Sequence, residues 1–432
     1  MEILEILVLV ISFVILLSLG VPIAFSIGIS ALLTMLVSIA PEPAFTTLAQ
    51  RMATGLDSFA LLAIPFFILA GQMMNRGGIA TRLIDLAKSL VGTLPGGLAY
   101  VNIVACMLFG AISGSAVAAA SAIGGIMNPR MVKEGYSRPF SAAVNITSAT
   151  TGMIIPPSNI LIVYSLASGG VSIAALFVAG YIPGLMLGFA LMIVAGFIAY
   201  KKKYPVGDRT SLKEVLKKFL DAIPSLLLLI VVIGGIIAGI FTATEASAVA
   251  VLYTIILSMV VYRQVKISDL PDILIHTVIT TAIVMLLIGT SMGMSWVMSY
   301  ANIPQAFSDA LLGISDNKIV ILIIINLILL FVGIFMDMTP AVLIFTPIFL
   351  PVVTALGVDP VHFGIIMVVN LCIGLCTPPV GSVLFVGCGV ADISISKVIK
   401  PLVPLFMAMV VALLLITYVP ELSLWLPRVF GL

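Results

Sequence analysis

Apolar residues in this chain come in long continuous runs, such as residues 3–39 and 319–335, instead of alternating with polar positions. An α-helix needs about 20 apolar residues to cross the roughly 30 Å hydrocarbon core of a bilayer. Strands of membrane β-barrels alternate apolar and polar residues in segments of about ten. The pattern therefore predicts an all-α polytopic membrane protein.

Composition supports this class. The chain has 432 residues, of which 62% are hydrophobic and 9% are charged, with a mean hydropathy of +1.30. Soluble domains are about 45–50% apolar and about 25% charged. So few charges cannot cover a water-facing surface, which excludes a soluble enzyme, a disordered chain and a nucleic-acid-binding protein. The first residues lack a basic region, so we expect a retained helix and no signal peptide.

Breakers divide the apolar runs at four places: residues 113–115 within 97–127, Pro156-Pro157 within 140–167, residues 337–340 within 319–356, and Pro378-Pro379 within 361–390. Three amphipathic segments, 79–91, 265–275 and 303–312, are expected to be arms that lie flat at the membrane interface.

Basic residues predict the orientation. If residues 201–221 are cytoplasmic, alternating crossings place all 20 Lys and Arg residues on that side except Arg51, Lys318 and Arg428. This arrangement requires segments 97–127 and 319–356 to be re-entrant, so that each enters and leaves on one side. It also places the N- and C-termini on the outer side of the membrane.

The two halves of the chain match each other at an offset of about 222 residues. Gly152 pairs with Gly374, and Pro156-Pro157 pairs with Pro378-Pro379. The charge distribution puts the two interrupted segments on opposite sides, so the repeats are predicted to be inverted. Inverted repeats with broken helices are typical of secondary transporters whose site lies near the midplane.

This organisation predicts five units along the chain. They are scaffold helices of repeat 1 (1–57); an arm, hairpin and broken helix forming half of a transport unit (58–200); a cytoplasmic linker (201–221); scaffold helices of repeat 2 (222–278); and a second arm, hairpin, broken helix and last helix (279–432).

Four segments carry a family resemblance: Gly-Ala-Ile-Ser-Gly-Ser-Ala (110–116), Gly-Met-Ile-Ile-Pro-Pro-Ser (152–158), Phe-Met-Asp-Met-Thr-Pro (335–340) and Gly-Leu-Cys-Thr-Pro-Pro-Val-Gly (374–381). In this order they resemble the large membrane subunit of tripartite ATP-independent periplasmic (TRAP) transporters. The resemblance implies an elevator-type importer of the bacterial inner membrane, driven by at least two Na⁺ and not an enzyme. It implies periplasmic termini, a separate small four-helix membrane subunit, and a periplasmic binding protein that delivers an organic acid such as sialic acid or a C4-dicarboxylate.

Unwound backbone suits a sodium site, because carbonyl oxygens replace the hydration shell of the ion. Glycine followed by two prolines removes N–H donors and leaves such carbonyls free. Following the two-sodium pattern of the family, we expect one site at Ser113, Gly152, Ile155 and Pro157, and a second at Gly333, Gly374, Thr377 and Val380.

Helix N-termini carry about half a positive unit charge and suit a substrate carboxylate. The substrate candidates are hydroxyl and amide side chains near the tips and breaks: Ser115, Asn145, Thr150, Ser158, Asn159, Asn370 and Ser382. Asp337 is the only acidic residue in segment 319–356, and an ionisable group at such depth is a functional candidate. It could cap the returning hairpin helix, tune a cation site or relay a proton.

The sequence gives less support to other functions. A channel would need a continuous polar pore, whereas the polar residues here cluster at the breaks. An intramembrane enzyme would need a catalytic dyad, and His276 and His362 are poorly placed to form one. A Na⁺/anion symporter of inverted-repeat fold that works without a binding protein stays as the alternative.

Overall fold

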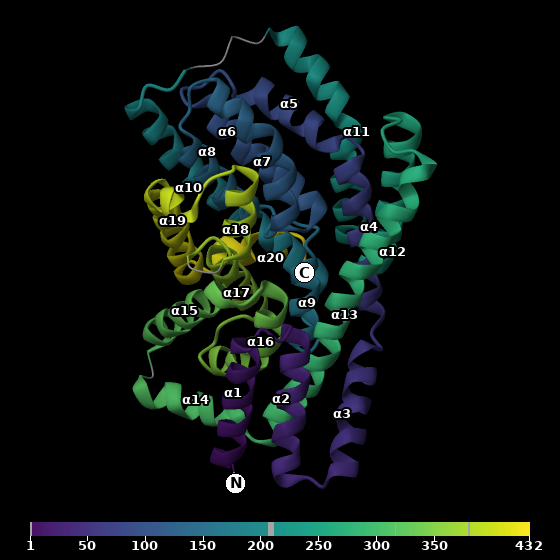
Figure 1. Ribbon diagram of the computed structural model, residues 1–432, viewed down its shortest axis with the longest axis vertical. Coiled ribbons are helices and arrows are strands. Elements are labelled where there is room, and N and C mark those ends of the chain that lie inside the picture. The colour runs from purple at the N-terminus through teal and green to yellow at the C-terminus, as the bar shows by residue number, and fades with distance from the viewer. Residues whose placement is uncertain (1, 206–210, 316, 379–380) are drawn as a thin grey trace.

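The computed structural model describes residues 2–205, 211–315, 317–378 and 381–432, and every regular element within these ranges is helical (Figure 1). Eight helices in the described part are long and apolar enough to cross a membrane. The chain is thus a polytopic helical membrane protein, as its apolar runs predict.

The first half contains α1 (Glu2–Ser18), α2 (Ile23–Ser38), α3 (Pro41–Leu56), the short η1 (Phe59–Leu62), α4 (Ala63–Arg76), α5 (Ile79–Val91), α6 (Gly97–Ser113), α7 (Ala116–Lys133), α8 (Arg138–Thr151), α9 (Asn159–Ala167) and α10 (Ile173–Lys201). The predicted helix at 79–91 and both predicted breaks of this half are confirmed.

The second half contains α11 (Leu212–Ile237), α12 (Ala243–Ile255), the π-helical η2 (Ile256–Val261), η3 (Ile267–Asp269), α13 (Leu270–Tyr300), α14 (Ile303–Ile314), α15 (Lys318–Phe335), α16 (Met338–Ala355), α17 (Pro360–Gly374), α18 (Ser382–Val390), α19 (Ile395–Tyr418) and α20 (Glu421–Val429). From the arms onward the order matches the first half, with α14 to α19 in the places of α5 to α10.

Each hairpin turns where its sequence stops favouring a helix. Gly114 lies at the tip of the α6–α7 hairpin with φ +62°, a left-handed conformation that costs glycine no steric strain. Ser115 then caps α7, because its hydroxyl accepts a hydrogen bond from the Ala118 N–H at 3.2 Å. In the second hairpin Asp337 occupies the N-cap position of α16.

The two broken helices form the centre of the molecule and run antiparallel. All residues of α8 from Phe140 to Thr151 and of α17 from His362 to Gly374 are buried. At one end, Arg138 of α8 lies 3.7 Å from the carboxylate of Asp392, which follows α18. At the other end, the Tyr164 hydroxyl of α9 donates to the Pro360 carbonyl of α17 at 2.6 Å. The start of each broken helix therefore meets the end of the other, as an inverted repeat requires.

The predicted arm at 265–275 is wrong. Residues 270–300 form one continuous helix, α13, and Pro271 is tolerated there because it occupies the first helical turn, where its missing N–H has no intrahelical partner. The predicted unit boundary at 278 consequently falls inside a helix. The linker is also shorter than predicted, since α11 begins at Leu212 with a capping box between Ser211 and Glu214.

The arm α5 is fastened to the start of α11, so the two repeats are joined at this end of the molecule. The Lys218 ammonium of α11 pairs with the Asp85 carboxylate of α5 at 2.6 Å. Figure 1 shows α5 and the start of α11 at one end, with the N-terminus and α14 at the other.

Candidate functional site

The hairpin tips and helix breaks of both repeats converge on one cavity of about 350 Å³. Its wall combines tip 1 (Ser113–Ala118), tip 2 (337–339), the break residues Met153 and Leu375, and two helices from outside the hairpins, α4 and α13. Side chains that are more than 200 residues apart in the chain thus share one space. The sequence predicts this convergence only through the inverted repeat.

Four helix N-termini border the cavity, and this is its main electrostatic feature. The lining includes the first residue of each of four helices: Ala116 of α7, Asn159 of α9, Met338 of α16 and Ser382 of α18. Each terminus presents unsatisfied N–H groups and a partial positive charge. Four of them around one space create an environment that favours an anion without a lysine or arginine in the described lining.

The polar side chains at these termini differ in their hydrogen-bond partners. The Ser382 hydroxyl is buried beside the cavity and has no hydrogen-bond partner among the described residues. Ser115 is already occupied by capping α7. The Asn159 amide lies beside Gly114: a Cβ built on that glycine would be 3.1 Å from Asn159 Nδ2. Of the predicted substrate residues, Ser115, Asn159 and Ser382 therefore line the cavity.

Asp337 also lines the cavity, and its side chain is exposed to this space. It stands at the N-cap of α16 without a side-chain capping hydrogen bond, and the Met338 N–H is the backbone group that faces its carboxylate. The carboxylate therefore lies at the start of the helix and on the wall of the cavity.

The first break provides free carbonyl oxygens. Among the described residues no backbone N–H donates to the carbonyls of Gly152, Ile155 or Pro157. Gly152 itself packs against Gly110 of the hairpin, where an added Cβ would lie 2.4 Å from the Gly110 Cα. Ser113, the fourth residue predicted for this site, lies at the hairpin tip and lines the cavity.

The second break repeats this packing. A Cβ on Gly374 would be 2.8 Å from the carbonyl oxygen of Gly333, so these two predicted residues are in backbone contact. The Thr377 carbonyl faces Gly381, whose N–H donates to it at 3.2 Å. Val380, predicted as a further ligand, lies outside the described residues.

Four other predicted substrate residues are buried between helices and do not line this cavity: Asn145, Thr150, Ser158 and Asn370. Asn145 donates to the Ala120 carbonyl at 2.9 Å, and Asn370 donates to the Asn326 side chain at 2.8 Å. Their amides hold the hairpins against the broken helices. In this structure the two asparagine side chains therefore contribute to packing between helices.

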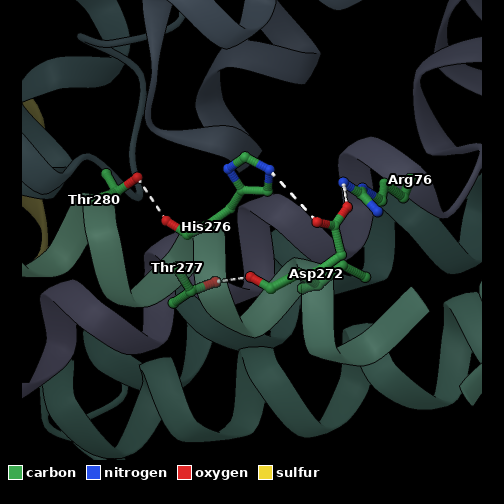
Figure 2. A network of polar contacts seen from close by, with 6 residues as sticks. Arg76, Asp272, His276, Thr277 and Thr280 are labelled. Carbon is green, nitrogen blue, oxygen red and sulfur yellow. Dashed lines mark hydrogen bonds and ion pairs between the residues drawn. The ribbon is translucent and has the colours of Figure 1, made fainter. Parts of the chain in front are cut away.

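Two cavity residues, Gln72 of α4 and Thr280 of α13, were missed from the sequence. Both are polar residues inside apolar crossings, and that signal could have identified them. The helices that carry them are linked by Arg76, whose guanidinium pairs with the Asp272 carboxylate at 2.5 Å, while His276 Nε2 lies 3.9 Å from the same carboxylate (Figure 2). This network joins α4 to α13 one turn away from the cavity.

The hydroxyls beside that network are engaged within their own helix. Thr280 donates to the His276 carbonyl at 2.9 Å, and Thr277 donates to the Ile273 carbonyl at 2.8 Å (Figure 2). Both hydroxyls thus bond carbonyls of α13, while the Arg76–Asp272 pair connects α13 to α4.

The fold is similar to that of a solved transporter. A crystal structure of the Alcanivorax borkumensis YdaH transporter superposes with a TM-score of 0.61 over 90% of this chain and 89% of that chain, at 15% sequence identity. At this identity the likeness concerns the fold alone.

Sequence relatives are much closer. An uncharacterised protein of Salmonella typhimurium, YgiK, is 59% identical over 97% of this chain and 96% of its own. The C4-dicarboxylate TRAP transporter large permease protein DctM of Pseudomonas aeruginosa is 40% identical over 94% of this chain and 95% of its own. The family model of the tripartite ATP-independent periplasmic transporter, DctM component, matches residues 10–422. The chain therefore belongs to the large membrane subunits of the TRAP transporters.

Proposed function

We propose that this subunit imports an organic acid together with Na⁺, by moving the hairpins and broken helices as one unit against a scaffold. We assign α13 to this scaffold and also α4, which the sequence boundaries at 58 and 200 place in the transport unit. The observation that carries this proposal is the cavity in which four helix N-termini, two hairpin tips and two scaffold helices meet. A site between two structural units can open to either side when one unit moves relative to the other.

Sodium coupling is supported by the first break, whereas at the second break the Gly374 and Thr377 carbonyls accept from the Thr377 and Gly381 N–H groups. Free carbonyls at Gly152, Ile155 and Pro157 supply oxygen ligands without placing a formal charge in the membrane. The equivalent glycine contact, Gly333 with Gly374, predicts a second ion in the other repeat. Asp337 places a carboxyl group on the wall of the shared cavity, and in its ionised form this group would favour cations nearby.

An organic acid is supported by the donors of the lining. Helix N-termini and the unpartnered Ser382 hydroxyl are donors, and donors bind carboxylates. Bound Na⁺ would offset the charge of the acid and of Asp337, so that ions and substrate bind cooperatively. C4-dicarboxylates are named for relatives at 40% identity and sialic acid for another at 40%, and both acids are therefore tested.

The partners follow from the family, which is tripartite. We infer a small four-helix membrane subunit that holds the scaffold in the bacterial inner membrane. We also infer a periplasmic binding protein that delivers the acid to the cavity. In the proposed orientation the connection between α10 and α11 is cytoplasmic and both termini are periplasmic.

Uptake in proteoliposomes tests the proposal. The chain is reconstituted with its small subunit and binding protein, and labelled succinate or N-acetylneuraminate is supplied under an inward Na⁺ gradient or an equal K⁺ gradient. We expect uptake of one acid that requires both Na⁺ and the binding protein. Uptake at the same rate in K⁺ would contradict sodium coupling, and uptake without the binding protein would favour the independent symporter.

A further inference from the structure

A second cavity, of about 630 Å³, lies between α5, the start of α11 and the end of η2. It is separate from the transport cavity, with which it shares no lining residue. Its polar lining includes Arg82, Asp85, Lys218, Asp221 and Tyr262. The proposed transport function assigns it no role.

The charges of this cavity are not all paired. Lys218 pairs with Asp85 at 2.6 Å, but in the described structure Arg82 and Asp221 form no ion pair. The Arg82 guanidinium lies over the Tyr262 ring, 3.5 Å from its centroid, and donates one hydrogen bond to the Gly78 carbonyl at 2.9 Å. Stacking orients a guanidinium while leaving other N–H groups free for a planar or tetrahedral anion. The cavity thus offers one available cation and one available carboxylate.

The wall includes Lys218 and Asp221 from the first half of the candidate span Lys213–Ile237, and Val261, which ends the candidate span Ala243–Val261. Charged residues in these positions are expected near the depth of lipid headgroups. Tyr262 directly follows the second span, a position at which aromatic residues mark the membrane interface. A phosphate-bearing headgroup at this level would be within reach of Arg82.

The rim of the cavity is apolar on its membrane side. Leu220 and Val261 line it and are 56% and 55% exposed, and Leu216 and Val260 beside them are 58% and 61% exposed. A soluble ligand would leave these side chains uncovered, whereas acyl chains attached to the headgroup would cover them.

The backbone of one wall departs from regular helix. Residues Ile256–Val261 form a π-helix, and Arg263, two residues beyond it, has φ +53°. π-helical turns occur frequently at functional sites, because they change the direction of the side chains that follow them. Here the π-helix directly precedes Tyr262, whose ring supports Arg82.

We propose that this cavity binds a zwitterionic phospholipid, with the phosphate on Arg82 and the headgroup ammonium on Asp221. The lipid would fill the junction between the arm α5 of one repeat and α11 of the other. Its headgroup would supplement the Lys218–Asp85 pair in holding the arm in place. This site is independent of the proposed transport cycle.

Binding to the purified chain tests the inference. Native mass spectrometry and thermal denaturation in detergent are followed during titration with phosphatidylethanolamine, phosphatidylglycerol or soluble phosphoethanolamine. We expect phosphatidylethanolamine to bind and to raise the Tm, and Arg82→Gln to weaken its affinity by about tenfold, as expected for a charge-assisted hydrogen bond. Asp221→Asn should reduce the preference for phosphatidylethanolamine over phosphatidylglycerol, because it removes the partner of the ammonium.

Two further variants separate binding from folding. Lys88→Gln removes a cation from the same helix, outside the cavity lining, and should leave affinity unchanged. Thr81→Phe changes no charge but places bulk in the cavity, and it should also block the lipid. Equal lipid binding by wild type, Arg82→Gln and Thr81→Phe would overturn the proposal.

Two other results would also overturn it. One is saturation by soluble phosphoethanolamine at the affinity of the lipid, which would identify a water-soluble ligand. The other is stoichiometric displacement of the lipid by the small membrane subunit, which would identify a protein interface.

Discussion

Gly333 and Gly374 touch through their backbones: a Cβ built on Gly374 would lie 2.5 Å from the Gly333 Cα. Gly110 and Gly152 make the same contact in the other repeat, where a Cβ built on Gly152 would lie 2.4 Å from the Gly110 Cα. Each pair brings the first arm of a hairpin against the end of a broken helix, next to the carbonyls proposed to bind Na⁺. The contact is therefore a shared element of both proposed ion sites.

Gly374→Ala should separate α15 from α17, because the added methyl would overlap backbone atoms that have no rotamer through which to move. We expect a loss of about 1–3 kcal/mol in the free energy of unfolding, as for other overpacked cores. The apparent affinity for Na⁺ should fall with it. Both are measured on purified protein by Na⁺-dependent thermal denaturation.

Gly389→Ala is the matched control, since a Cβ at that helical position meets nothing within 4 Å. It should leave Na⁺ affinity unchanged and stability equal or slightly higher. If the two variants behave alike, the close contact has no role in ion binding.

Asp337→Asn separates two roles of the hairpin-tip carboxylate. Asparagine is as good an N-cap as aspartate, so the variant should fold with unchanged stability. It removes a negative charge from the cavity, and we expect the Na⁺ concentration for half-maximal uptake to rise by about tenfold. Unchanged Na⁺ dependence in Asp337→Asn, together with lower stability in Asp337→Ala, would show that the residue only caps α16.

Ser382→Ala should lower the affinity for the substrate without lowering the stability of the protein. The hydroxyl has no partner in the described structure, so its loss breaks no internal hydrogen bond and the Tm should stay the same or rise. Loss of a hydrogen bond to the acid should raise the KM for uptake by about five- to tenfold. Ser148→Ala is the control, because its buried hydroxyl bonds the Val144 carbonyl in α8 at 2.5 Å. That variant should lower stability and leave the KM unchanged.

Local signals made much of this fold predictable. Serine and glycine at 113–115 and the Asp-Met-Thr-Pro run at 337–340 stop helices through their own backbone and capping preferences, so both hairpin tips could be located from sequence. A helix that is buried on every side, such as α8 or α17, has no sequence signal that shows which of its faces meets the cavity. Asn145 and Asn370 are predicted from the sequence as substrate ligands, and in this structure their amides bond neighbouring helices. Pro271 was misleading for another reason, because a proline in the first turn starts a helix as readily as it ends one.

Labelling from the two sides of the membrane tests the orientation inferred from the basic residues. Lys203→Cys lies just beyond α10, and Gly313→Cys lies on the exposed part of α14. The native cysteines Cys106, Cys372, Cys376 and Cys388 are buried, so their background labelling should be small. An impermeant maleimide should reach position 313 in intact spheroplasts and position 203 only in inverted vesicles. The reverse pattern would invert the topology, and labelling of both from one side would contradict inverted repeats.

The contact between tip 1 and α4 offers a direct test of elevator movement. A Cβ on Gly71 would lie 3.4 Å from the Ser113 Cα, close enough for a disulfide between cysteines at these positions. We expect oxidation of Gly71→Cys/Ser113→Cys to stop uptake, because the hairpin could no longer slide along the scaffold, and a reductant to restore it. Each single variant should respond to neither treatment, which separates the cross-link from damage to the proposed Na⁺ site. If the fully cross-linked protein takes up substrate as fast as the protein treated with reductant, the tip does not move along α4.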